Sequence, residues 1–199
     1  GDLEHIDEAL ATFQQALAMA PDHVGILVRM GTLLRRCGQA ARAMQHLQAA
    51  LKLAPGNVEA LVGVGDIFFE LGRTEPALAS YDLALKQAPD HQVAHNNRAF
   101  ALECQGRRDE ALTGYRRVLE LNPDNIFAHL RLAGLEPTQP DGARLRHLET
   151  LVAGDNLGTS DRSQLHFALG RMHDRCDQVG LAFAHYVAAN RLRGESRGG

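Results

Sequence analysis

Apolar, small and turn-forming residues recur along the chain at a fixed interval of 34 residues. One position of this pattern is always alanine, at Ala9, Ala43, Ala77 and Ala111. The same interval separates a set of larger residues and a set of prolines, namely Phe13, Leu47, Tyr81 and Tyr115, and Pro21, Pro55, Pro89 and Pro123. A unit of this length cannot bury its apolar face alone, so we expect stacked copies of one helical unit.

Each 34-residue unit is predicted to fold as two antiparallel helices joined by a tight turn. In the unit at 58–91, Gly65 lies in the first helix, and Ala77 and Ala84 lie in the second. These residues are small, which lets the two backbones approach closely without a clash. Gly72 is expected to form the turn, because glycine adopts a positive φ without a steric cost.

The boundaries between units follow from the prolines and the polar residues after them. Pro89 cannot continue a helix interior, and Asp90 is expected to cap the next helix. The predicted segments are a half-repeat at 6–22, regular repeats at 24–57, 58–91 and 92–125, a divergent hairpin at 126–152 and a C-terminal hairpin at 163–193. They predict an all-α, right-handed solenoid of antiparallel helical hairpins across 1–193, with a disordered tail at 194–199.

The hairpin at 126–152 departs from the regular pattern. Pro137 and Pro140 break the chain where the turn belongs, and Leu145 replaces the small alanine of the second helix. A larger side chain at that site should hold the two helices apart, so this hairpin is expected to be splayed or rotated. After it the register returns, with Gly170 at the small position of the C-terminal hairpin.

Small residues at two sites, an aromatic residue between them and a terminal proline at this period resemble the tetratricopeptide repeat. The resemblance implies a superhelix in which the first helix of each repeat lines a concave groove that holds extended peptides. The groove positions that it implies here are Gly25, Val28, Thr32, Arg35, Glu59, Val62, Asp66, Phe69, Val93, Asn96, Phe100, Glu103, Phe127, Leu130, Arg171 and Asp174. Asn97 is expected to join Asn96 in reaching the backbone of the ligand.

Two features of this expected groove bear on the ligand. Phe69 and Phe100 are expected either to contact the ligand or to pack against neighbouring repeats, and the residues alone leave both interpretations open. Val28 and Thr32 stand where some relatives carry the Lys and Asn that clamp a chaperone's terminal carboxylate. We therefore predict a scaffold that binds a peptide or a protein, with chaperone tails disfavoured as partners.

The string FALG…AFAHYVAANRL, with the broken hairpin before it, resembles the N-terminal part of bacterial tetratricopeptide-repeat sulfotransferases. This resemblance covers 92–192 and implies an alternative function, the non-catalytic substrate-recognition arm of a larger enzyme. The sequence contains no GxxxxGK[ST] phosphate-binding loop. A triad of Cys104, His95 and Asp109 would lack an oxyanion loop, so the chain is not predicted to be an enzyme and no catalytic residue is assigned.

Histidines are numerous, with ten in the chain, and two groups of them suggest metal ligands. The groups are His91 with His95, and His166 with His173 and His185. No HExxH motif and no Cys/His cluster with ligand spacing supports either group, so packing is the favoured interpretation. Accordingly, neither a metal site nor a cofactor is predicted.

Composition and charge change this picture little. Apolar residues make up 45% and charged residues 23%, which is typical of a folded globular protein. A net charge of −3 gives no reason to expect nucleic acid or a membrane as a partner. Cys37, Cys104 and Cys176 form no CxxC motif, which predicts reduced thiols and a cytoplasmic location. Solenoid ends expose apolar faces, so a homo-oligomer stays open as an expectation.

Overall fold

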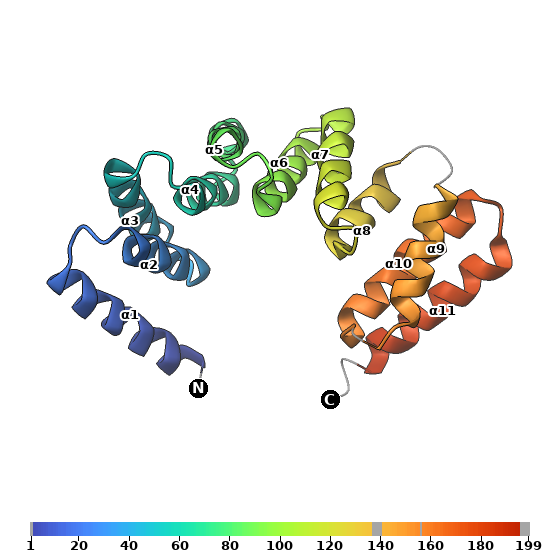
Figure 1. Ribbon diagram of the computed structural model, residues 1–199. Helices are drawn as coiled ribbons and strands as arrows, with labels where there is room; N and C mark the ends of the chain where they lie inside the picture. The colour runs from blue at the N-terminus through green and yellow to red at the C-terminus, as the bar shows by residue number, and fades with distance from the viewer. Residues whose placement is uncertain (1, 137–140, 156, 196–199) are drawn as a thin grey trace. The chain divides into compact units, whose positions relative to one another are not determined.

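The computed structural model describes residues 2–136, 141–155 and 157–195, which form eleven α-helices and no β-strand (Figure 1). The all-α fold class predicted from the sequence is confirmed. The chain divides into two compact units, Gly1–Arg107 and Arg108–Gly199. One continuous solenoid across 1–193 stays a prediction. No helix among the described residues combines the length and the apolar character that crossing a membrane requires.

Unit 1 contains six helices that follow the predicted repeats. They are α1 (Asp2–Met19), α2 (Val24–Arg36), α3 (Ala40–Leu53), α4 (Val58–Glu70), α5 (Thr74–Gln87) and α6 (Gln92–Cys104). Helix α2 packs on α3, and α4 packs on α5, as two hairpins (Figure 1). The first helices of successive repeats also touch, since α2 contacts α4 and α4 contacts α6.

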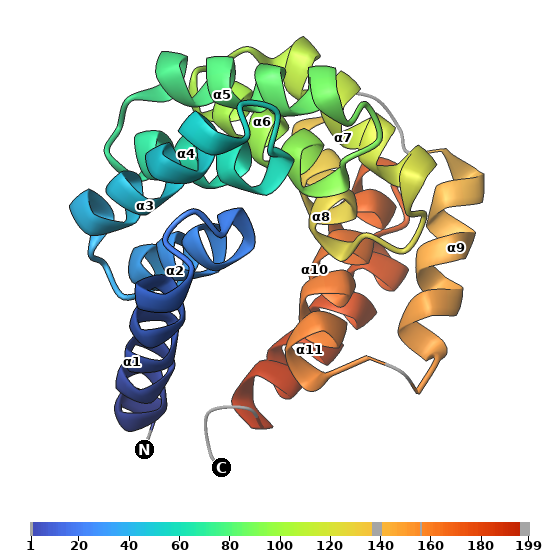
Figure 2. The ribbon, with the colours of Figure 1, turned by 60° about the vertical axis from the view of Figure 1, so that its left-hand side comes forward.

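Unit 2 contains the remaining helices. They are α7 (Arg108–Leu121), α8 (Ile126–Leu135), α9 (Gly142–Ala153), α10 (Thr159–Arg175) and α11 (Val179–Glu195). Helices α10 and α11 form a hairpin, while α8 packs on α7 and α10. Helix α9 packs on α10 and stands at the edge of unit 2 (Figure 2). It meets α8 through side chains, for example the rings of His129 and His147, whose centroids are 5.9 Å apart. The hairpin at 126–152 is therefore splayed.

Helices α2, α4, α6 and α8 begin at one repeating cap position. The cap residues are His23, Asn57, His91 and Asn125. Each side chain accepts a hydrogen bond from the backbone N–H three residues further on, a donor that has no partner inside the helix. The prediction of Asp90 as a cap is wrong, because the cap is its neighbour His91, whose Nδ1 lies 3.2 Å from the backbone nitrogen of Ala94.

Close packing of the two helices in a hairpin explains the recurrent glycine of the first helix. A Cβ at Gly65 would lie 2.5 Å from Cε1 of Tyr81, and a Cβ at Gly170 would lie 2.5 Å from Cε1 of Tyr186. Both separations are shorter than real Cβ contacts, so any larger residue would force the ring to move. The turn residue Gly72 has a φ of 71°, which confirms the predicted positive φ at this position.

The C-terminal end differs from the prediction. Helix α11 continues to Glu195, so Gly194 and Glu195 are helical and do not belong to a disordered tail. Nε of Arg191 lies 3.7 Å from Oε1 of Glu195, and this ion pair between residues four apart supports the last turn. The rest of the predicted tail, 196–199, and the predicted breaks at 137–140 lie outside the described residues.

Candidate functional site

Many of the predicted groove positions lie on the first helices of the repeats in unit 1. We call the side chains that α2, α4 and α6 present there, together with Glu70 of α4, the helix-A face. Its members are Thr32, Arg35, Glu59, Asp66, Phe69, Glu70, Val93, Asn96, Asn97, Phe100 and Glu103. Glu59, Glu70 and Val93 are exposed, and the other members are half-buried.

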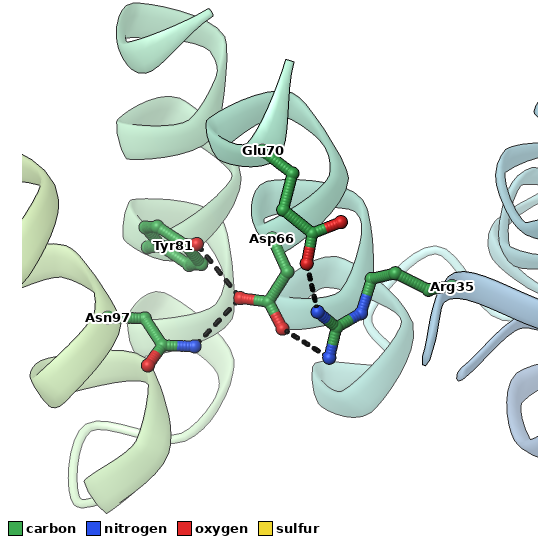
Figure 3. Close-up of polar contacts among 5 residues, drawn as sticks. All are labelled: Arg35, Asp66, Glu70, Tyr81 and Asn97. Carbon is green, nitrogen blue, oxygen red and sulfur yellow. Dashed lines mark hydrogen bonds and ion pairs between the residues drawn. The ribbon is translucent and has the colours of Figure 1, made fainter. Parts of the chain in front are cut away.

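A polar network joins the helix-A face to α5 (Figure 3). Asp66, in the middle of α4, accepts hydrogen bonds at Oδ1 from the Tyr81 hydroxyl at 2.9 Å and from the Asn97 amide at 2.7 Å. Its other oxygen, Oδ2, lies 3.2 Å from Nη2 of Arg35, and Nη1 of Arg35 donates to Glu70. Helices α2, α4, α5 and α6 all contribute a member, so the network holds these side chains in fixed positions.

Burial governs the ionisation of this network. It raises the pKa of the Asp66 carboxyl above its ordinary value, against the opposing effects of the Tyr81 hydroxyl, the Arg35 charge and the Asn97 amide. Burial also raises the pKa of the Tyr81 phenol, and the negative charge of Asp66 adds to this effect. When both carboxylates are ionised, the Arg35 guanidinium faces the negative charges of Asp66 and Glu70. The network then has one positive and two negative charges, which gives a net charge of −1.

The raised pKa of Asp66 predicts a specific pH dependence of stability. The folded chain holds this proton more tightly than the unfolded chain, so the stabilisation is complete below the ordinary pKa of 3.8. It is lost as the pH rises through the folded-state pKa. We compare the free energy of unfolding of the wild type with that of Asp66→Asn. The wild-type value minus the variant value should fall as the pH rises from below 3.8 to above the folded-state pKa of Asp66. Urea unfolding at a series of pH values measures this difference.

Asp22→Asn is the control for this pH series, because Asp22 is an exposed carboxyl of unit 1. It should give a difference from wild type that changes less with pH than the difference for Asp66→Asn. A pH-independent difference for Asp66→Asn, or one that grows as the pH rises, would show that burial does not dominate the ionisation of Asp66.

Phe69 and Phe100 form a pair of half-buried rings on the helix-A face. Their centroids are 5.5 Å apart and their planes are inclined by 57°, a geometry typical of favourable aromatic pairs. The contact joins α4 to α6, so packing between neighbouring repeats is confirmed for both side chains. Because both rings remain partly exposed, this packing leaves apolar surface on the face, and contact with a ligand stays a prediction.

Three predicted groove residues are placed differently from the expectation. The side chains of Val28 and Val62 are only 8% and 6% exposed. They therefore pack in the interior and offer little surface to a ligand. Their positions on α2 and α4 turn toward the core, where Val28 packs in the main apolar cluster of unit 1. The amide nitrogen of Asn97 is bonded to Asp66, and its carbonyl oxygen points away from that carboxylate (Figure 3). Asn97 therefore positions Asp66.

The predicted positions in unit 2 have separate surroundings. Phe127 is 41% exposed, and its ring meets the ring of Tyr115 edge-on, with centroids 6.0 Å apart. Leu130 packs against the core of unit 2, whereas Arg171 and Asp174 are exposed. These residues belong to the other unit, and the helix-A face as defined contains none of them.

The first histidine pair has structural partners. His91 caps α6, and Nε2 of His95 lies 2.7 Å from the carbonyl oxygen of Pro89. The second contact recurs one repeat later, where Nε2 of His129 lies 2.7 Å from the carbonyl oxygen of Pro123. A histidine at this position thus ties the first helix to the proline turn before it, which supports the packing interpretation of this pair.

An open pocket that the sequence pattern did not indicate lies between α3 and α4. Its volume is about 820 Å³, and its lining residues are Gly38, Gln39, Ala40, Ala41, Arg42, Met44, Gln48, Ile67, Phe68, Leu71 and Arg73. The guanidinium carbon of Arg73 lies 5.0 Å from the ring centroid of Phe68, which covers one wall with a cation–π contact. The lining includes no member of the helix-A face, and no motif marks it.

Three family profiles match the chain, and all carry the description tetratricopeptide repeat. They match residues 1–57, 37–99 and 93–125, so together they run without a gap from residue 1 to residue 125. No curated protein sequence matches the chain significantly.

Solved structures of helical-repeat proteins are similar to this chain. BtubC (BKLC) from P. vanneervenii has a TM-score of 0.74 at 18% identity, with 98% of this chain and 91% of that chain covered. YrrB, described as a TPR protein with an unusual peptide-binding site, has a TM-score of 0.65 at 16% identity, with 92% of each chain covered. The first TPR of Spaghetti (RPAP3), bound to the HSP90 peptide SRMEEVD, has a TM-score of 0.54 at 23% identity, with 56% and 89% covered. At these identities the similarity shows the fold alone.

Proposed function

The chain belongs to the tetratricopeptide-repeat family, and on that premise we propose that it is a non-catalytic scaffold that binds an extended peptide along the helix-A face. Proteins of this fold are typically scaffolds, and YrrB and RPAP3 are described with peptide sites of their own.

The observation that carries the proposal is the network centred on Asp66. It ties three successive first helices together through buried or half-buried polar contacts, with Arg35 on α2 and Asn97 on α6. The Phe69–Phe100 ring pair lies on the same helices, α4 and α6, and keeps part of its surface exposed. A surface whose side chains are already held in place loses little conformational entropy on binding, which favours affinity.

The charge of the network indicates the kind of peptide. When Asp66 and Glu70 are both ionised, its net charge is −1, and the exposed Glu59 adds a further carboxylate to the face. Val28 and Thr32 occupy positions where a terminal-carboxylate clamp would need Lys and Asn. We therefore infer a ligand with apolar side chains for the ring pair and a basic residue for the carboxylates. An acidic tail is the opposite of this chemistry.

Substitution of the ring pair tests the proposal directly. Peptides selected from a random library against the full chain are labelled, and their Kd values are measured by fluorescence anisotropy. Phe69→Ala and Phe100→Ala should each raise the Kd at least about tenfold, since a central aromatic contact commonly contributes about 2 kcal/mol or more. The peptide SRMEEVD should bind more weakly than a peptide in which its acidic residues are replaced by lysine.

Phe183→Ala is the matched control, because Phe183 is a phenylalanine of unit 2 that is 68% exposed. It should leave the Kd unchanged. If the selected peptides bind the Phe69→Ala and Phe100→Ala variants as tightly as wild type, the ligand lies elsewhere on the chain. Far-UV circular dichroism of each variant separates a lost contact from a lost fold.

The alternative predicted from the C-terminal string, a recognition arm of a sulfotransferase, has no counterpart among the relatives named above and stays a prediction. A cytoplasmic location and a homo-oligomer also stay predictions. The exposed apolar residues of α11 bear on the last of these, and they include Val179, Leu181, Phe183 and Val187. Light scattering of the purified chain determines its oligomeric state.

A further inference from the structure

Three helices of unit 2 bring one carboxylate and two histidines together. Glu149 of α9, His173 of α10 and His185 of α11 each offer one ligand atom, and these atoms all lie within 4.8 Å of one another. His173 is 1% exposed, and the other two residues are half-buried. Imidazole nitrogens and a carboxylate oxygen are the usual protein ligands of zinc and related divalent metals.

The contacts of His173 leave one of its ring nitrogens available to a cation. Nδ1 lies 2.6 Å from Oε1 of Gln178, an amide oxygen that only accepts, so this nitrogen carries a proton. Nε2 lies 3.3 Å from Oε1 of Glu149, yet it is buried without a hydrogen bond of good geometry among the described residues. In the neutral ring this Nε2 directs a lone pair toward the carboxylate, and a cation between them would satisfy both.

The ring of His185 is held between two other histidines. It stacks on His173 with a centroid distance of 5.1 Å and an interplanar angle of 9°. Nδ1 of His185 lies 2.9 Å from Nδ1 of His166, so one of these nitrogens donates and the other accepts. These contacts place the His185 ring close to His173 and to the Glu149 carboxylate.

We propose that Glu149, His173 and His185 form a site for a divalent transition metal of the Zn²⁺ class, with a fourth coordination position left open. Metal–ligand bonds of about 2.1 Å place two ligand atoms about 3.4 Å apart in a tetrahedral site, so the ligand atoms must approach one another by roughly 1 Å. Because a metal lies in the plane of each imidazole that binds it, the ring of His185 must also rotate out of its stack with His173. Glu149 is half-buried near the end of α9 and can make its approach by rotation of its side chain.

The ion would link α9 to the hairpin of α10 and α11. Helix α9 packs on α10, and the rings of His147 and His129 join it to α8. A bridge from Glu149 to His173 and His185 would therefore add a constraint between α9 and both helices of the hairpin. The expected role is structural, and the open position would hold water or a ligand atom supplied by a partner.

Metal titration of the full chain, without an affinity tag, tests the site. We expect one Zn²⁺ per chain with a Kd at or below about 10 µM, a Tm raised by several degrees, and a Co²⁺ absorption spectrum typical of four-coordinate geometry. Glu149→Gln and His185→Gln should each weaken Zn²⁺ binding at least about tenfold and remove the increase in Tm. Absence of binding at about 100 µM Zn²⁺, or binding that both variants leave unchanged, would overturn the proposal.

His147→Gln is the matched control, because His147 also lies on α9 and also faces a carboxylate, with Nε2 2.9 Å from Asp124. It should leave the stoichiometry and the Kd for Zn²⁺ unchanged. Circular dichroism establishes that each variant is folded before titration. If one test variant does not fold, the other variant and the Co²⁺ spectrum of the native chain decide. The outcome is independent of the peptide proposal, because no member of the helix-A face is altered.

Discussion

Gly65→Ala is expected to lower the free energy of unfolding by about 2 kcal/mol, although glycine to alanine in a helix interior ordinarily raises stability by about 1 kcal/mol. The added carbon would lie 2.5 Å from Cε1 and 2.8 Å from Cδ1 of Tyr81. The ring cannot simply turn aside, because it is 1% exposed and its hydroxyl donates to Asp66. Urea unfolding followed by far-UV circular dichroism measures the loss.

Gly180→Ala supplies the matched control for this substitution. Gly180 is helical in α11, and a Cβ there would meet no atom within 4 Å outside its own helix and chain neighbours. It should unfold at the same or a slightly higher urea concentration than wild type. Gly65→Ala as stable as wild type would mean that α4 and α5 have room between them, against the close approach described above. The displaced Tyr81 ring should also disturb Asp66, so weaker peptide binding by Gly65→Ala is expected.

Glu136→Ala is expected to destabilise the chain by about 3 kcal/mol, because it leaves a largely buried arginine without its counter-ion. Oε2 of Glu136 lies 2.6 Å from Nη1 of Arg144, and Oε1 lies 3.3 Å from Nη2 of Arg116. The side chains of Glu136 and Arg144 are only 10% and 13% exposed. Urea unfolding again reports the change, and thermal unfolding gives an independent value.

Two further variants show whether charge is the cause. Glu120→Ala removes an exposed carboxylate that pairs with Arg117 on the same helix, and it should cost less than about 0.5 kcal/mol. The double variant Glu136→Ala with Arg144→Leu removes both buried charges and should recover much of the stability lost by Glu136→Ala alone. A double variant no more stable than the single one would mean that packing around Glu136, and not its charge, sustains this region.

The regular repeats could be predicted because their determinants are local and recur. A glycine such as Gly72 forms its turn wherever a positive φ is needed, whatever lies around it. The cap at the start of α6 was missed by one residue, because Asp90 and His91 are both polar and only the backbone geometry decides which side chain reaches the free N–H. The true cap, a His or Asn at each repeat, could have been found from its own 34-residue interval.

The candidate site could be predicted only in part. The repeat pattern correctly predicted that Arg35, Asp66 and Phe100 lie partly exposed on the first helices of their repeats. It also predicted that Val28 and Val62 are exposed in the groove, whereas the structure buries both side chains. Neither the hydroxyl of Tyr81 nor the carboxylate of Glu70 was singled out from the sequence. A position number within a repeat specifies a direction from the helix axis, whereas exposure also depends on what the neighbouring helix places against it.

The contacts within unit 2 could not be predicted from local sequence signals. The prolines and Leu145 indicated that the hairpin at 126–152 would open, but they did not indicate that α8 would pack on α10. From the sequence, His173 and His185 were grouped as possible metal ligands, but packing was favoured because the spacing matched no motif. The structure adds Glu149 from a third helix, and this carboxylate was not indicated by the sequence.

By itself, then, the sequence determined the helices, their turns and the small residues at which they pack, because those features depend on backbone conformation and side-chain size at single positions. The tertiary structure decided which polar side chains meet, as in the pairing of Arg35 with Asp66 and of Glu136 with Arg144. Such contacts join side chains from different elements of the fold. Their energies depend on burial and on the distance between the charges, and neither can be read from a single position in the sequence.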